Sequence, residues 1–97
     1  MDNKSCIYII TNRKDGVLYT GLTAHLKERI ENHKTKKHEN SFSARYNLDK
    51  LVYFEAFTDV KDAYKREKQV KAGSRKKKVK LIESLNPDWK DLFDEID

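Results

Sequence analysis

The residues that hold small disulfide-rich or metal-stabilised domains together are nearly absent from this chain. Its 97 residues include one cysteine, one proline and three glycines. The single cysteine, Cys6, cannot form an intramolecular disulfide, and its apolar neighbours predict a buried, reduced thiol. The three histidines, His25, His33 and His38, do not have the spacing of zinc ligands, so we expect no structural zinc site.

Long hydrophobic runs are also absent. No apolar run approaches the roughly 18 residues that indicate a membrane-spanning helix. The segment from Met1 to Lys4 lacks the charged start and apolar core of a signal peptide. We therefore expect a soluble cytoplasmic protein with no membrane partner. A length of 97 residues is sufficient for one compact domain, so we predict a single domain over residues 1–97, as a monomer or weak homodimer.

Positive charge is abundant, and it is concentrated in one segment. Between Lys61 and Lys80 there are ten lysine and arginine residues and two acidic ones, whereas residues 84–97 carry five acids and one lysine. The basic segment predicts a polyanionic partner such as nucleic acid, although a solvated helix face has the same composition. The candidate nucleic-acid contacts in this segment are Lys65, Lys68, Lys71, Arg75, Lys76, Lys77 and Lys78.

The N-terminal third predicts a β-hairpin. Residues Ser5–Asn12 and Val17–Leu22 are rich in β-branched and aromatic side chains, and the Asp-Gly pair between them is a strong turn signal. Both faces of the first segment are apolar, so we expect a central strand that is covered on both sides.

The rest of the chain predicts helices around one further strand. The first helix is predicted from a Thr23 cap to about Lys36, with Leu22, Leu26 and Ile30 as its core stripe. One helical turn at Ser43–Tyr46 and a strand with alternating faces at Leu51–Phe57 follow. The remaining predicted segments are a helix from Thr58 or Asp59 to Ala72, a helix from Ser74 to about Leu85, and a short acidic helix after Pro87. The order β-β-α-β-α-α predicts an α/β protein of the α+β type, with helices packed on a small antiparallel or mixed sheet.

The hairpin register decides how two tyrosines lie. If Asn12 pairs with Val17, Tyr8 faces Gly21, and Tyr8 and Tyr19 project from the same face roughly 7–8 Å apart. Gly21 would then leave space opposite Tyr8 where a ligand can approach. Taken alone, two phenols on one face indicate cross-strand packing more often than a shared site.

Polar residues on two of the predicted helices favour the second interpretation. His25, Arg29 and His33 form one stripe, in which Arg29 offers donors suited to phosphate oxygens, unless the stripe is simply solvated. On the next long helix, Glu67 falls within the apolar stripe of Val60, Ala63 and Val70. A carboxylate in that position needs a partner, which is either a neighbouring cation or a hard metal ion such as Mg²⁺.

These residues resemble the GIY-YIG nuclease family, and in particular its short, stand-alone bacterial members. The resemblance is carried by Cys6-Ile7-Tyr8, Tyr19-Thr20-Gly21, Leu26-Lys-Glu-Arg29-Ile-Glu-Asn-His33, Ala44-Arg45-Tyr46, Leu51-Val-Tyr53-Phe-Glu55, Arg66-Glu67-Lys68-Gln69 and Leu85-Asn86-Pro87-Asp-Trp89. Two positions depart from the signature triplets. Cys6 stands in place of the first glycine, and Thr20 in place of the central isoleucine.

The resemblance implies a three-stranded antiparallel sheet flanked by helices and metal-dependent cleavage of DNA. Tyr19 would act on the nucleophilic water, Tyr8 would position that water or the scissile phosphate, and Arg29 would stabilise transition-state charge. Glu67 would hold a single Mg²⁺ or Mn²⁺. The expected supporting groups are His33 and, more weakly, Asn86, and the expected nucleic-acid contacts outside the basic segment are Gly21, His25 and Arg45.

Three functions remain open at this point. The first is a metal-dependent endonuclease acting on DNA rather than RNA, with single-stranded or branched DNA as candidate substrates and low sequence specificity. The second is a non-catalytic nucleic-acid-binding module that retains the nuclease fold. The third is a protein-interaction role for the acidic segment Asp88–Asp97, unless that segment packs on the protein's own basic helices.

Overall fold

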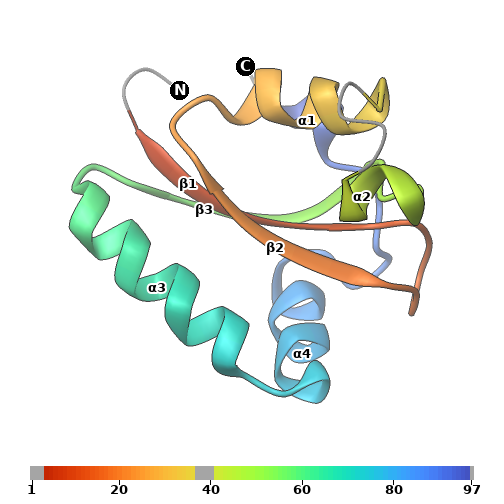
Figure 1. The fold of residues 1–97 in the computed structure, drawn as a ribbon. Coiled ribbons are helices and arrows are strands. Elements are labelled where there is room, and N and C mark those ends of the chain that lie inside the picture. Colours follow the sequence, from red (N-terminus) through yellow and green to blue (C-terminus); the bar gives the residue numbers. More distant parts are fainter. Residues whose placement is uncertain (1–3, 37–40, 97) are drawn as a thin grey trace.

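The computed structural model describes residues 4–36 and 41–96, and its centre is a three-stranded antiparallel sheet in the order β2-β1-β3 (Figure 1). The elements are β1 (Ser5–Thr11), β2 (Leu18–Thr23), α1 (Leu26–Lys34), α2 (Phe42–Arg45), β3 (Lys50–Phe57), α3 (Val60–Ala72), α4 (Arg75–Leu85) and a short 3₁₀ helix, η1 (Phe93–Glu95). The predicted α+β class and the three-stranded antiparallel sheet are confirmed. The prediction of a single domain over residues 1–97 stays a prediction.

The middle strand, β1, separates two hydrophobic cores. Its side chains from Cys6 to Ile10 are almost completely buried. Tyr8 and Ile10 pack with α1 on one face of the sheet, whereas Ile7 and Ile9 pack with α3 and α4 on the other. Figure 1 shows the same layers, with α1 and α2 on one side of the sheet and α3 and α4 on the other. Burial of each isoleucine contributes roughly 1.5–3 kcal/mol, so the apolar double face stabilises β1 as the central strand.

The hairpin has the predicted register, with Tyr8 opposite Gly21 and Ile10 opposite Tyr19. In the turn it is Asp15, at φ 60°, that adopts the left-handed conformation. Gly16 is required for a different reason, since a Cβ there would lie 2.0 Å from the side-chain oxygen of Asn12. That oxygen accepts a hydrogen bond from the backbone N–H of Val17, which fixes the turn.

Strand β3 departs from the predicted alternation. A bulge interrupts its pairing with β1, where Ile9 faces Tyr53 and Ile10 faces Leu51. The extra residue, Val52, therefore packs in the same core as Tyr53, whereas Leu51 packs in the opposite core. A prediction that assumes strict alternation of side chains along the strand does not include such an extra residue.

Helix α1 begins later than predicted. Thr23 belongs to β2, and its hydroxyl accepts a hydrogen bond from the backbone N–H of His25, which occupies the cap position. Leu22 was expected in the core stripe of this helix, but it lies on β2 and packs in the core on the α3 and α4 side. Of the three residues in the predicted stripe, Leu26 and Ile30 lie on α1, and both are buried.

Helices α3 and α4 follow the prediction closely. The Asp59 carboxylate accepts from the N–H of Lys61, and the Ser74 hydroxyl accepts from the N–H of Lys77, so both caps are as expected. Of the predicted stripe on α3, Ala63 and Val70 are buried, whereas Val60 is 58% exposed at the first helical position.

Among the described residues after Pro87 the predicted acidic helix does not form, and the 3₁₀ turn η1 follows. The carboxylate of Asp91 instead pairs with the Lys34 ammonium and accepts a hydrogen bond from the N–H of Leu51. Asp91 therefore contacts α1 and β3 of its own chain, whereas the predicted alternative named the basic helices.

Within the described part of the chain, no helix is both long and apolar enough to cross a membrane.

Candidate active site

Three aromatic rings from three elements meet on one face of the sheet. The ring centroids of Tyr8 on β1 and Tyr19 on β2 lie 6.5 Å apart, and that of His33 on α1 lies 5.8 Å from Tyr8 and 6.1 Å from Tyr19. The Tyr8 hydroxyl lies 3.1 Å from Nε2 of His33, and Nδ1 of the same ring lies 2.8 Å from Oγ of Ser43. This chain of contacts fixes the phenol of Tyr8 and the imidazole of His33 relative to each other.

Gly21 has a different role from the one expected. A Cβ at this position would lie 2.3 Å from Cζ and 2.4 Å from the hydroxyl oxygen of Tyr8. The space opposite Tyr8 is therefore filled by the Tyr8 ring itself and is not open to a substrate backbone. Gly21 is needed because the phenol must cross β2 to reach His33.

Tyr8 is held in its protonated form. Burial raises the pKa of its phenol to about 12, the neighbouring Tyr19 and the negative charge of Glu67 add to this, and the nearby positive charge of Arg29 opposes it. A phenol with this pKa carries its proton at neutral pH and can donate a hydrogen bond. It is a poor base, so Tyr8 fits a positioning role better than proton removal.

Tyr19 and Arg29 lie at the open side of this cluster. They line a cavity of about 190 Å³ together with Asn32, His33, Lys36, Ser41, Phe42 and Ser43. The side chain of Arg29 is exposed, and together with His25 it also borders a smaller adjoining hollow. An always-charged guanidinium beside a half-buried phenol gives the cavity the chemistry to bind a phosphate group.

Glu67 approaches the cluster from the other layer. It lies on α3, which packs against β2 and β1, and its side chain is 15% exposed. Its carboxylate lies 3.4 Å from the Lys71 ammonium, so the predicted neighbouring cation exists. Within residues 4–36 and 41–96, no hydrogen bond joins Glu67 to either tyrosine, but its charge is close enough to raise the pKa of Tyr8.

The donor set around Glu67 fits one type of metal site. No group of three or more histidine, cysteine, aspartate or glutamate side chains that could hold a metal occurs among the described residues. A single carboxylate does not suit zinc, but it suits Mg²⁺ or Mn²⁺, which accept one carboxylate alongside waters and substrate phosphates.

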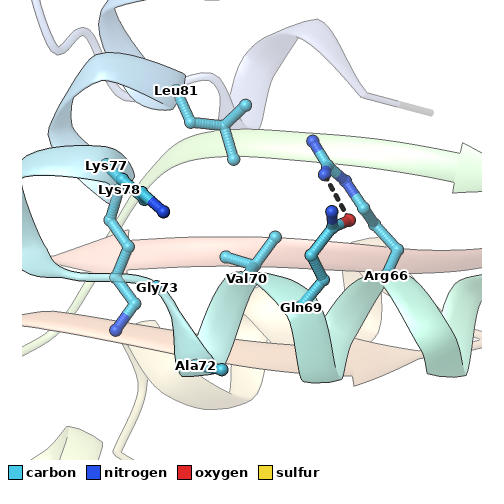
Figure 2. A pocket seen from close by; sticks show the side chains of 8 residues that line it. All are labelled: Arg66, Gln69, Val70, Ala72, Gly73, Lys77, Lys78 and Leu81. Atoms are coloured by element: carbon cyan, nitrogen blue, oxygen red, sulfur yellow. Dashed lines mark hydrogen bonds between the residues drawn. The ribbon is translucent and has the colours of Figure 1, made fainter.

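The basic segment lies in the opposite layer from the tyrosines. Figure 2 shows a groove between α3 and α4, about 380 Å³ in volume, where Arg66 and Gln69 face Lys77 and Lys78. The predicted contacts Lys65, Lys68, Lys71, Arg75, Lys76, Lys77 and Lys78 all lie on these two helices.

Two further predicted site residues have structural partners away from the cluster. The guanidinium of Arg75 donates to the carbonyl oxygens of Asp15 and Gly16, so it anchors the hairpin turn to α4. The buried side chain of Asn86 donates to the carbonyls of Val52 and Lys90 and accepts from the N–H of Lys90. Neither residue is brought to the tyrosines.

Several polar and aromatic residues near the site had no strong signal in the sequence. Ser43 is buried against His33, and Phe42 lies 6.2 Å from Tyr19 between ring centroids. Ser41 caps α2 by accepting from the N–H of Ala44, and this local capping pattern is the signal that could have placed the start of the predicted helical turn at Phe42 instead of Ser43. Arg45 is exposed on the same turn. His38 lies outside the described residues.

Comparison with known proteins agrees with these features. Residues 4–80 match the family model of the GIY-YIG catalytic domain. The UPF0213 protein SSP2268 of Staphylococcus saprophyticus is 42% identical over 84 residues, which cover 82% of this chain and 95% of that protein. The UPF0213 protein of Syntrophus aciditrophicus is 33% identical over 86 residues, covering 89% and 97%.

A solved structure also shares the fold. The solution NMR structure of the UPF0213 protein BH0048 from Bacillus halodurans has 31% sequence identity and a TM-score of 0.56, and the match covers 91% of this chain and 92% of that one. Family model, relatives and fold agree with each other, and the chain therefore belongs to the GIY-YIG family, alongside the small bacterial UPF0213 proteins.

Proposed function

We propose that this protein is a divalent-metal-dependent nuclease that hydrolyses phosphodiester bonds in DNA. The observation that carries the proposal is the convergence of Tyr19, Arg29 and His33 on one cavity, directly beside the buried phenol of Tyr8. Membership of the GIY-YIG family supports the nuclease chemistry.

Each residue at the cavity has a role that its surroundings support. Tyr8, protonated and fixed by His33, orients the attacking water or the phosphate by donating a hydrogen bond. Tyr19 is less buried and lines the cavity, so it is the better candidate to act on the nucleophilic water. Arg29 stabilises the charge that develops on the phosphate. Loss of one such donor typically lowers the rate about 100-fold to 1,000-fold.

Glu67 is the residue we assign to the metal ion. Nuclease activity in this family generally depends on a divalent metal, and the single carboxylate fits Mg²⁺ or Mn²⁺. When bound, such an ion supplies positive charge that stabilises the phosphate and the leaving oxygen.

DNA is the proposed substrate, with phosphate contacts from the exposed lysines of α3 and α4 and from His25 and Arg45. Contacts of this kind read no sequence, so we expect low sequence specificity and a preference that depends on strand structure. We place the protein in the cytoplasm, because its single cysteine, Cys6, is buried and cannot form an intramolecular disulfide, as is typical of proteins in a reducing compartment.

The proposal is tested by incubating the purified protein with single-stranded, duplex and branched DNA, and with RNA, in Mg²⁺ or Mn²⁺. We expect Tyr19→Phe, Arg29→Ala and Glu67→Gln to lower cleavage at least 100-fold while binding is retained. Tyr64→Phe and Asp62→Asn, which alter exposed residues of α3, are the matched controls and should cleave as the wild type does.

Two outcomes would contradict the proposal. Equal cleavage by the wild type and by Glu67→Gln would mean that the activity comes from a contaminant. Salt-sensitive binding with no cleavage under any condition would favour the non-catalytic binding module.

A further inference from the structure

Two aromatic side chains beside the candidate active site are exposed to solvent. Phe42 on α2 is 50% exposed, and Tyr46, which directly follows α2, is 43% exposed. Their ring centroids lie 4.8 Å apart. A single exposed ring is ordinary, but two in contact at the rim of a cavity form an apolar surface that water solvates poorly.

These rings continue the buried cluster outward. Successive centroids from Tyr8 to Tyr19, Phe42 and Tyr46 are 6.5, 6.2 and 4.8 Å apart. Tyr8 is buried and Tyr19 is partly buried, whereas the two outer rings are exposed. The row therefore leads from the candidate catalytic phenols to the molecular surface. A ligand held at Tyr19 has a continuous aromatic surface beside it.

Positive charge flanks the same surface. Arg29 and Lys36 line the cavity together with Phe42, and Arg45 lies between the two exposed rings in the sequence. The side chains of all three cations are exposed. Aromatic rings bordered by cations suit a strand of unpaired nucleotides, because bases stack on the rings while phosphates meet the cations.

We propose that Phe42 and Tyr46 form a stacking surface for an unpaired nucleobase next to the phosphate bound at Tyr19 and Arg29. The inference rests on the proposed function for the identity of the strand, but it concerns binding and not cleavage. A base inside a duplex is covered on both faces by its neighbours and cannot stack on a protein ring. The surface therefore selects single-stranded or locally opened DNA over continuous duplex.

The experiment measures binding without cleavage, in EDTA, using a fluorescein-labelled single-stranded oligonucleotide and the matching duplex. Phe42→Leu and Tyr46→Leu should each weaken single-strand binding about 10-fold and change duplex binding less than about twofold. The slope of log Kd against log salt should stay the same, because no phosphate contact is removed. Tyr46→Phe keeps the ring and should bind as the wild type does.

Tyr64→Leu is the matched control, since Tyr64 is also an aromatic residue, 51% exposed, but lies on α3 in the other layer. It should leave single-strand binding unchanged. A second measurement needs no variant and so does not depend on the folding of Phe42→Leu. A 2-aminopurine base in the strand should lose fluorescence when the wild-type protein binds, as a stacked base does.

Unchanged single-strand affinity in both leucine variants would overturn the inference, and would leave the exposed rings as a surface for a protein partner. Equal losses for single strand and duplex would overturn it too, as would the absence of 2-aminopurine quenching. The cleavage test of the proposed function and these binding tests can fail independently of each other. A protein that cuts nothing but shows these binding changes keeps the stacking surface, whereas one that cuts normally without them loses only this inference.

Discussion

Tyr8 is the residue on which the candidate site depends most. Its ring crosses β2 above Gly21, its hydroxyl lies within hydrogen-bonding distance of His33, and burial raises the pKa of its phenol to about 12. The position of this one phenol therefore depends on the absence of a side chain at residue 21. That dependence can be tested without touching any of the polar groups assigned to the chemistry.

Gly21→Ala should displace the Tyr8 ring and lower the free energy of unfolding by roughly 1–3 kcal/mol, because its Cβ would lie 2.3 Å from Cζ of Tyr8. Urea denaturation measures the loss, and NMR of the His33 ring reports the broken contact. Gly73→Ala is the matched control, since a Cβ there meets nothing closer than 3.3 Å and its φ of −71° suits any residue. A Gly21→Ala protein as stable as the wild type would show that the ring is not confined.

Among the helices, α3 contacts all three strands of the sheet from one side. Its Arg66 guanidinium forms three hydrogen bonds with the Glu55 carboxylate on β3, and the same carboxylate accepts from the Tyr53 hydroxyl. The charge of the next residue, Glu67, is close enough to raise the pKa of Tyr8. By anchoring α3 to β3, the Arg66–Glu55 contact helps to fix the helix that carries Glu67.

Glu55→Gln should destabilise the protein by roughly 1–3 kcal/mol, because it leaves the guanidinium of Arg66 without its charged partner. Arg66→Lys should have a similar effect, since an ammonium cannot make the same forked contact. Chemical denaturation measures both, with Asp62→Asn on the exposed side of α3 as the control. If both variants change the free energy of unfolding by less than about 0.5 kcal/mol, the pair does not hold α3 in place.

At the scale of the whole molecule, each face of the sheet contains one buried phenol. Tyr8 belongs to the core beneath α1, and Tyr53 to the core beneath α3 and α4. Burial raises the pKa of Tyr53 to about 12, and its hydrogen bond to Glu55 adds to this. Both layers of the fold therefore depend on a phenol that stays protonated.

Stability should fall steeply at alkaline pH. A phenol whose pKa rises from 10.0 to about 12 on folding binds its proton more tightly in the folded state, so raising the pH favours unfolding. The stabilisation is complete below about pH 10 and is lost as the pH approaches about 12. Urea unfolding across this range measures the slope, which Tyr8→Phe and Tyr53→Phe should reduce and Tyr64→Phe should not. An unchanged slope in both phenylalanine variants would contradict the raised pKa values.

Much of the fold could be predicted because it depends on local pattern. The Asp-Gly turn sets the hairpin register, and the apolar side chains on both faces of the first strand place it at the centre of the sheet. The caps at Asp59 and Ser74 begin α3 and α4 as predicted. The bulge at Val52 and the late start of α1 could not be predicted, because both result from packing between distant segments.

Local sequence pattern was sufficient to predict the central apolar strand, the pairing of Tyr8 with Gly21, and the family to which these residues belong. The consequence of that pairing came from the folded arrangement alone. It filled the space at Gly21 with the Tyr8 ring, joined His33 to that ring, and separated the basic helices from the tyrosines by the thickness of the sheet. The physical reason is that spacing along a chain fixes which face a side chain occupies, whereas its partners come from segments far apart in the sequence.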